Sequence, residues 1–205
     1  MIPVQLQPEP ARFSVQVQQP GEAFLARIPR PTAEDWNTHS YWTRVLDDLY
    51  RAYSGICAYS CHWIPMDTGA RTVEHFRPKK LYPQEAYRWA NYRLVCSTLN
   101  GRKGDHEDVL DPFTLSEGWF ILDFPSLFVQ PGAHLLAAQK EQVMNTIKRL
   151  GLNDEGTCLQ ARINWLRDYI TVPLPFSYLE KKAPFLAVEL KRQNLIEAIR
   201  EIMVY

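Results

Sequence analysis

The sequence lacks a long apolar run, a secretory signal and any internal repeat or low-complexity segment. No stretch approaches the roughly 18 consecutive apolar residues of a membrane-spanning helix, so we expect no membrane association. Residues 1–10 have neither the basic region nor the apolar core of a signal peptide, and we therefore expect a cytoplasmic protein. A composition of 46% apolar and 22% charged residues excludes a disordered or fibrous chain and predicts a globular fold.

Net charge is also missing, because 23 Lys and Arg balance 23 Asp and Glu over the 205 residues. Taken as a whole, this argues against a dedicated nucleic-acid binder. The charge is unevenly spread, however. Residues 71–104 hold eight basic and two acidic residues, a local net charge of +6, whereas residues 105–123 hold six acidic residues and no Lys or Arg. The basic segment can bind a phosphate backbone, or it can be a solvated mixed surface.

Cysteine is scarce, with four residues, and nothing points to secretion, so a disulfide framework is not expected. Cys57 and Cys61 lie close together and Cys96 follows some distance later, which is a spacing that metal ligands can have. Buried free cysteines, packed as small apolar residues, are the alternative.

Proline is concentrated in residues 1–32, which hold six of the 15, and this predicts an extended arm with a short strand at 13–17. A helix is expected to begin at the capping pattern of Thr32 and Asp35 and to end at Gly55. Further helices are predicted by apolar periodicity; they cover 135–150, 155–170 and 184–203, and Gly151 caps the first.

The chain is thus divided into a Pro-rich arm and helix (1–54), a central segment (55–112) and a helical extension (113–205). We expect an α+β fold that is mainly α, with an irregular N-terminal arm and flanking helices around a small central core. The central segment is irregular and rich in Cys, His, Trp and Arg, and it carries the chemistry.

Glu74 and His75 are adjacent in that segment, and Asn100 follows later. Neighbouring side chains on a strand point to opposite sides, but a bend or strand end lets Glu74 hold a hard cation while His75 faces a water. Asn100 offers a second hard oxygen, and Mg²⁺ suits one or two protein oxygens with waters and a substrate phosphate. A neutral imidazole suits a general base, so these residues would support metal-assisted phosphodiester hydrolysis.

The order Glu-His at 74–75, Trp-x-Asn-x-x-Leu-x-Cys at 89–96 and Asn-x-x-Lys-Gly at 100–104 resembles the HNH endonucleases. That resemblance implies a ββα-metal core, in which a two-stranded ribbon and a helix clasp one Mg²⁺ or Mn²⁺. It implies that His75 is the general base and that Glu74 and Asn100 are the metal ligands. It also implies that Asn91 braces the loop and orients the histidine. The residues implied near the substrate phosphates are Arg77, Lys79 and Lys103.

The run Glu-His-Phe-Arg-Pro-Lys at 74–79, with the segments at 110–112 and 146–153, resembles a narrower group. These are HNH proteins of bacterial antiphage systems, such as the nuclease subunit of the Septu system and retron-associated HNH proteins. The match is strongest over 55–112. The resemblance implies DNA as the substrate and a companion ATPase subunit as a partner.

One departure from the HNH pattern concerns zinc. Many HNH proteins hold a structural zinc between two C-x2-C pairs, but here Cys57 and Cys61 form C-x3-C, and Leu99 stands at the expected fourth cysteine. Zinc would need Cys57, Cys61 and Cys96 with His62 or another ligand. The alternative is an apolar cluster in place of the metal, made of Cys57, Cys96, Leu99 and Trp63.

Other interpretations of the chain remain. It can be a catalytically weak or inactive nucleic-acid-binding or adaptor subunit, or a cysteine hydrolase that uses Cys57 or Cys61 with His75 and Asn91. Asp105 and His106 are a rival metal pair. Two apolar groups are candidates for docking a partner: Phe13, Phe24 and Leu25 in the arm, and Trp119, Phe120, Phe124 and Phe128.

Overall fold

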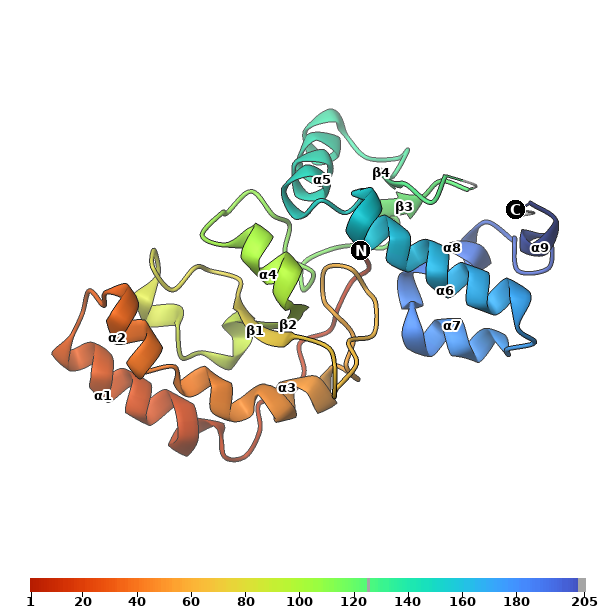
Figure 1. The fold of residues 1–205 in the computed structure, drawn as a ribbon. Coiled ribbons are helices and arrows are strands. Elements are labelled where there is room, and N and C mark those ends of the chain that lie inside the picture. Colours follow the sequence, from red (N-terminus) through yellow and green to blue (C-terminus); the bar gives the residue numbers. More distant parts are fainter. Residues whose placement is uncertain (125, 203–205) are drawn as a thin grey trace. The chain divides into compact units, whose positions relative to one another are not determined.

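The computed structural model describes residues 1–124 and 126–202 (Figure 1). The chain forms two compact units. The first, which we call the ribbon unit, consists of Gln5–Cys57 and Ile64–Glu107. The second, the C-terminal unit, consists of Met1–Val4, Ala58–Trp63 and the chain from Asp108 onward. The N-terminal segment and most of the expected central core therefore share one unit.

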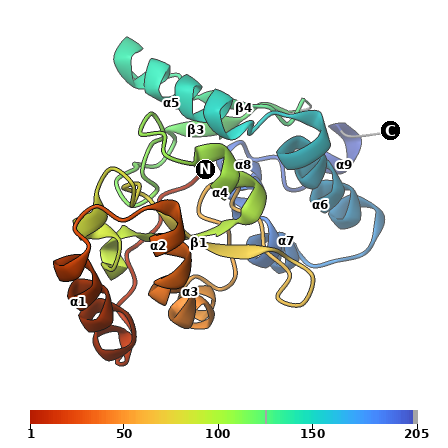
Figure 2. The ribbon, with the colours of Figure 1, turned by 60° about the vertical axis from the view of Figure 1, so that its left-hand side comes forward.

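The ribbon unit is named for two antiparallel strands, β1 (Arg71–His75) and β2 (Tyr92–Cys96). Thr72 and Val73 in β1, and Tyr92 and Val95 in β2, are residue types that favour a strand. The register pairs Glu74 with Arg93 and His75 with Tyr92. Helix α4 (Ser97–Lys103) follows β2 directly, and the connection from β1 to β2 contains the 3₁₀ turns η3 (Pro83–Glu85) and η4 (Trp89–Asn91). Figures 1 and 2 show α4 and α3 (Leu46–Ala52) on opposite sides of this ribbon.

Residues 14–27 are helical, so the strand predicted at 13–17 is wrong, whereas residues 1–10 have no helix or strand and match the predicted irregular arm. The π-helical turn η1 (Ser14–Gln18) runs into α1 (Gln19–Arg27). Phe13, Val17 and Phe24 are buried, which is a helical spacing that the short alternating pattern hid.

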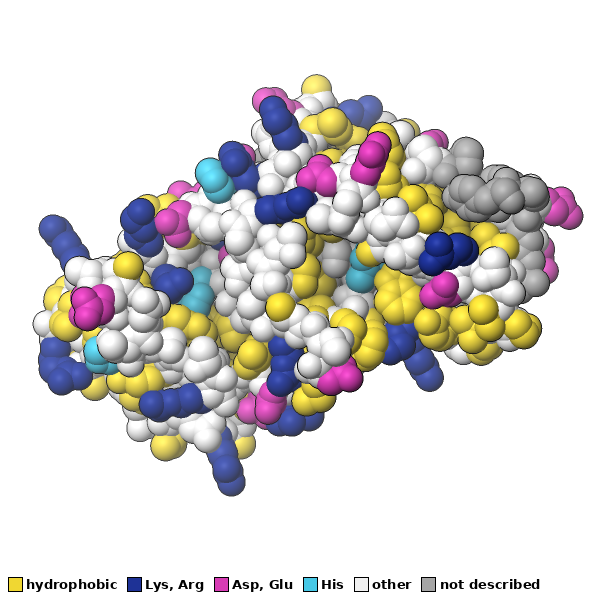
Figure 3. Space-filling model, in the orientation of Figure 1, with side chains coloured by type: hydrophobic (Ala, Val, Ile, Leu, Met, Phe, Trp, Pro, Cys, Tyr) yellow, Lys and Arg dark blue, Asp and Glu magenta, His cyan; other side chains and the backbone are white. Residues whose placement is uncertain are grey.

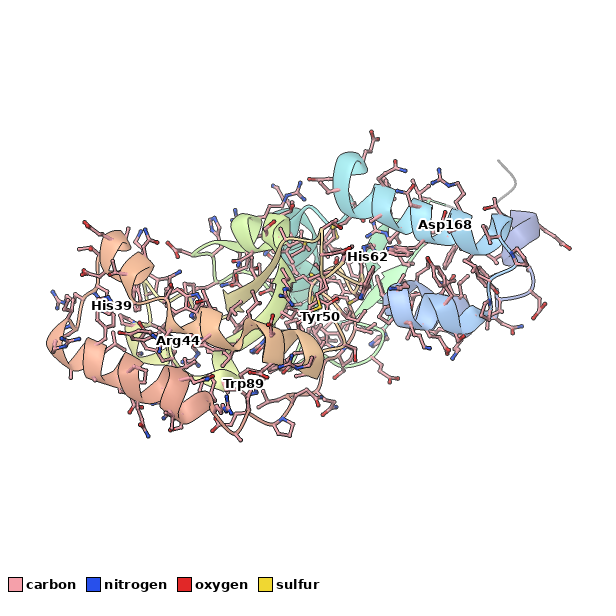
Figure 4. All side chains as sticks on the ribbon, turned by 60° about the horizontal axis from the view of Figure 1, so that its bottom comes forward. His39, Arg44, Tyr50, His62, Trp89 and Asp168 are labelled. Carbon is pink, nitrogen blue, oxygen red and sulfur yellow. The ribbon has the colours of Figure 1, made fainter. Side chains whose placement is uncertain are left out.

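Proline is tolerated within this helix because its missing donor is replaced. Pro20 has no N–H to give to the carbonyl of Gln16, and the guanidinium of Arg44 donates to that oxygen at 2.9 Å instead. Figure 4 shows His39 and Arg44 on the side of the unit that carries α1.

The capping box at Thr32 and Asp35 is confirmed, and it begins α2 (Ala33–Thr38). The long helix expected after it is interrupted at 39–40, beyond which η2 (Tyr41–Val45) and α3 continue. Phe13 and Phe24, proposed as docking residues, are core residues at 1% and 0% exposure.

Gly21 allows an aromatic cluster to pack on α1. A Cβ at this position would collide with the ring of Tyr87, whose hydroxyl donates to the carbonyl of His39 at 2.7 Å. The same ring packs against Phe24, Trp36 and Trp42.

The C-terminal unit is mainly helical. It contains β3 (Phe120–Leu122) paired with β4 (Val129–Pro131), a sheet that periodicity did not predict because each strand has three residues. Its helices are α5 (Ala137–Leu150), η5 (Glu155–Leu159), α6 (Gln160–Thr171), α7 (Phe176–Lys182), α8 (Pro184–Arg192) and α9 (Ile199–Ile202).

The predicted helices of this unit are largely confirmed. Gly151 caps α5 in the left-handed conformation at φ 60°. The helix expected over 184–203 is split into α8 and α9, and its last residue lies outside the described residues. The buried Arg162 donates to the carbonyls of Leu127 and Leu152. Within the described part of the chain, no helix combines the length and apolar character needed to cross a bilayer. The fold class, α+β and mainly α, is confirmed.

Gly21→Ala is expected to destabilise the protein by about 1–3 kcal/mol, because the new methyl group overpacks against Tyr87. Urea unfolding measures this. Gly101→Ala is the matched control: it lies in the exposed part of α4 with nothing within 4 Å of a new Cβ, and alanine there should add up to about 1 kcal/mol of stability. A Gly21→Ala protein as stable as wild type would contradict this packing.

Candidate functional site

A cavity of about 350 Å³ lies along β1 in the ribbon unit. Its wall includes Glu74, His75, Asn100 and Lys79, so it brings together four of the residues singled out in the sequence. Asn91, Arg77 and Lys103 do not line it. The remaining lining residues are Trp42, Thr43, Leu46, Arg71, Thr72, Val73, Pro78, Gly104 and Asp105.

Glu74 is a buried carboxylate that is held by a buried lysine. Its Oε1 lies 3.0 Å from Nζ of Lys103, and both side chains are almost fully shielded from solvent. Burial raises the pKa of Glu74 to about 7, and the neighbouring charge of Lys103 works against that rise. Burial therefore favours the protonated carboxyl, and the ion pair with Lys103 favours the charged one.

His75 ends β1 and its ring is fixed by a backbone carbonyl. Nε2 lies 3.0 Å from the carbonyl oxygen of Ala86, which can only accept, so Nε2 carries the proton. Burial, and next the charge of Lys79, lower the pKa of His75 to about 3. The imidazole is consequently neutral at pH 7, with its free lone pair on Nδ1. The edge-to-face contact with Trp42, 4.7 Å between ring centroids, holds the ring from another side.

Asn91 braces the loop that follows His75. Its Oδ1 accepts from the backbone N–H of Arg77 at 2.7 Å, and its Nδ2 donates to the carbonyls of Arg77 and Glu85 at 3.0 and 3.1 Å. The next carbonyl after Glu85 is that of Ala86, the partner of His75. Asn91 thus fixes both the loop and the chain segment that orients the imidazole.

Lys103 has a different position from the phosphate contact expected for it. It is fully buried, and its amine donates to the carbonyls of His75 and Phe76 at 3.2 and 2.7 Å as well as pairing with Glu74. It lies one helical turn after Asn100 on α4, so it points back onto the end of β1. Its role in the structure is to tie α4 to that strand.

The other two basic residues are accessible. Arg77 is exposed, and Lys79 is half-buried at the cavity with its amine 5.4 Å from the ring centroid of Trp42. Figure 3 shows Lys and Arg side chains more often than Asp and Glu over the end of the ribbon unit that carries α1 and α2. Lys79 and Arg77 are therefore better placed than Lys103 to meet a phosphate.

A divalent cation would find two hard oxygen ligands in the cavity. Glu74 offers a carboxylate and Asn100 an amide oxygen, and Mg²⁺ or Mn²⁺ prefers such groups together with waters. The residues present therefore fit one such ion. Asp105 also lines the cavity but pairs with Lys80 at 3.6 Å, and its neighbour His106 is exposed.

Among residues 1–124 and 126–202, no group of three or more His, Cys, Asp or Glu side chains is placed to hold a metal ion. Cys57, Cys61 and Cys96 therefore form no such group, and neither do Glu74, His75 and Asp105 of the cavity. The cysteine-hydrolase interpretation also loses support, because no cysteine is among the residues that line the cavity containing His75.

The cavity residues that sequence reasoning missed include Trp42 and Thr72. Thr72 had a usable signal, because it precedes Glu74 by two residues and so shares its face of the strand. Trp42 had none, since it reaches the cavity from η2 through a long-range contact.

No family model matches the chain. The chain is similar to the Septu protein PtuB of Bacillus thuringiensis, with 28% identity over 97 residues, which is 47% of this chain and 36% of that protein. The matched segment thus spans about a third of the length of this curated relative.

Glu74 and His75 are expected to have opposite effects on stability in acid. The pKa of His75 falls from 6.5 to about 3 on folding, so its protonation favours unfolding as the pH drops through that window. The pKa of Glu74 rises from 4.5 to about 7, so its protonation favours the folded state. Between pH 4.5 and 6.5 the two contributions have opposite signs.

Single substitutions should expose each contribution. Glu74→Gln should lose about 1.4 kcal/mol more stability than wild type for each pH unit of acidification in this window, and His75→Gln should show the reverse change. Urea unfolding at several pH values measures both slopes. Parallel slopes for the three proteins would show that these groups do not titrate as their burial requires.

Proposed function

We propose that this chain is a divalent-metal-dependent endonuclease of the HNH type, which hydrolyses DNA phosphodiester bonds in a bacterial antiphage defence system related to Septu. The observation that carries the proposal is one cavity, on a strand–strand–helix scaffold, that contains Glu74, Asn100 and a neutral His75. The similarity to a Septu protein supports the setting in defence.

His75 would act as the general base. With Nε2 donating to Ala86, Nδ1 is the atom that can take a proton from an attacking water. The lowered pKa keeps this atom unprotonated at neutral pH, and the bracing by Asn91 holds the ring in place before substrate arrives. The proton taken up would leave the buried ring readily, because burial disfavours the charged form.

Glu74 and Asn100 would hold one Mg²⁺ or Mn²⁺. When bound, such an ion stabilises the charge that develops on the phosphate and on the leaving oxygen. Lys79 at the cavity and Arg77 beside it would offset the charge of the flanking phosphates. Lys103 would not contact the substrate; it would hold the carboxylate of Glu74 in place through their ion pair.

A companion ATPase is the partner that we propose, on the strength of the resemblance to antiphage HNH proteins. An isolated nuclease of this kind would then cut weakly. The comparison to make is between the chain alone and the chain co-purified with the product of its neighbouring gene.

A second candidate is an adaptor subunit that binds nucleic acid without cutting it. The ion pair between Glu74 and Lys103 favours this alternative, because one oxygen of the only carboxylate proposed as a ligand is already engaged by an amine. An adaptor would bind DNA in a salt-dependent manner and leave it intact with every divalent cation.

His75→Ala is expected to reduce plasmid nicking by a factor of about 100 or more, because the general base is removed. The assay uses purified protein with Mg²⁺ or Mn²⁺, with the companion subunit present. His134→Ala changes an exposed histidine of the C-terminal unit and should cut at the wild-type rate. Nicking by His75→Ala at the wild-type rate would rule out the proposed mechanism.

Metal removal separates this proposal from the cysteine hydrolase. EDTA should abolish nicking and added Mn²⁺ should restore it, while iodoacetamide should have no effect, because Cys57 and Cys61 are buried at 0% and 1% exposure. Loss of activity with iodoacetamide and persistence in EDTA would favour the thiol chemistry instead.

A further inference from the structure

The amide of Asn100 is held in one orientation by strand β1. Its Nδ2 donates to the hydroxyl of Thr72 at 2.8 Å and lies 3.5 Å from the carbonyl oxygen of Val73. The hydroxyl of Thr72 donates in turn to the carbonyl of Val95 on β2 at 2.8 Å. A hydroxyl has one proton, and this proton is used, so the oxygen of Thr72 can only accept from Asn100.

This network makes the reversed amide unfavourable. If the amide turned over, Oδ1 of Asn100 would face two oxygens without a proton between them, the hydroxyl of Thr72 and the carbonyl of Val73. Leaving those groups unpaired in a part-buried site is unfavourable, because each loses a hydrogen bond that water does not fully replace. The observed orientation commits Nδ2 to the strand and leaves Oδ1 as the atom available to the cavity that Asn100 lines.

We propose that Thr72 is a positioning residue for the metal site: its hydroxyl selects the rotamer of Asn100 that presents an oxygen, not an NH₂ group, to a divalent cation. The inference rests on the proposed function, in which Asn100 is a ligand. Thr72 and Glu74 are two residues apart on β1 and line the same cavity, so one strand face supplies a ligand and also orients the other ligand.

The chemistry requires this selection. Mg²⁺ and Mn²⁺ bind an amide through its carbonyl oxygen, whereas the NH₂ group has only donors to offer. If the amide of Asn100 could turn freely, it would present its NH₂ group instead of Oδ1 to the cation for part of the time. When a group that hydrogen-bonds and orients a metal ligand is removed, metal affinity typically falls by about 10- to 100-fold.

The test measures Mn²⁺ affinity by calorimetry on the full-length protein without DNA. Thr72→Val keeps the shape and removes the hydroxyl, and it should weaken Mn²⁺ binding by about 10- to 100-fold. Thr72→Ser restores the hydroxyl and should bind within a few-fold of wild type. Thr98→Val, at an exposed threonine of α4, should not change the affinity. Thr72→Ala is measured in parallel in case the valine methyl groups disturb the ribbon.

A second background separates orientation from general damage to the fold. Asn100→Asp presents an oxygen in either orientation, so Thr72 has nothing to select there. Thr72→Val should therefore leave the Mn²⁺ affinity of the Asn100→Asp protein unchanged or improve it. An equal loss in both backgrounds would show a structural role and overturn the proposal.

The outcomes also distinguish this inference from the proposed function. If wild type binds Mn²⁺, Asn100→Ala weakens binding and Thr72→Val does not, the positioning role is wrong and the proposed function is untouched. If wild type binds no Mn²⁺ and shows no nicking with its companion subunit, the proposed function fails and the inference fails with it.

Discussion

The buried ammonium group of Lys103 is the contact on which the candidate site depends. It joins the carboxylate of Glu74 to the carbonyls of His75 and Phe76, so one side chain of α4 fixes the last two residues of β1 and the start of the loop. Removing one partner of such a pair leaves an uncompensated buried charge, which is far more costly than losing a surface ion pair. The site is consequently built around a charge that never reaches solvent.

The same burial determines the protonation of the two neighbours on β1. A carboxylate and an imidazole taken out of water both shift toward their neutral forms, which raises the pKa of Glu74 and lowers that of His75. For His75 this keeps the imidazole unprotonated at neutral pH, and it also makes the ring a weaker base than a histidine whose pKa is near 7. For Glu74 the shift is opposed by the ion pair with Lys103, which favours the charged carboxylate.

The sequence was informative where structure is local and uninformative where it is not. The capping box at Thr32 and the left-handed cap at Gly151 were predictable, because both depend on neighbouring residues. The strand expected at 13–17 failed, because five alternating residues fit one face of a helix that continues past Pro20. Lys103 was misplaced for a related reason: the spacing from Asn100 was visible, but which way that helix face points depends on how α4 packs on the ribbon.

The assignment of the chain to its two units has a consequence for how the protein can be divided. The chain passes from one unit to the other after Val4, Cys57, Trp63 and Glu107. Neither unit is a continuous stretch of the gene, because residues 58–63 belong with the C-terminal helices although both flanks belong with the ribbon. A truncation that keeps residues 1–107, and so every residue of the candidate site, therefore still cuts through the C-terminal unit, because residues 1–4 and 58–63 belong to it.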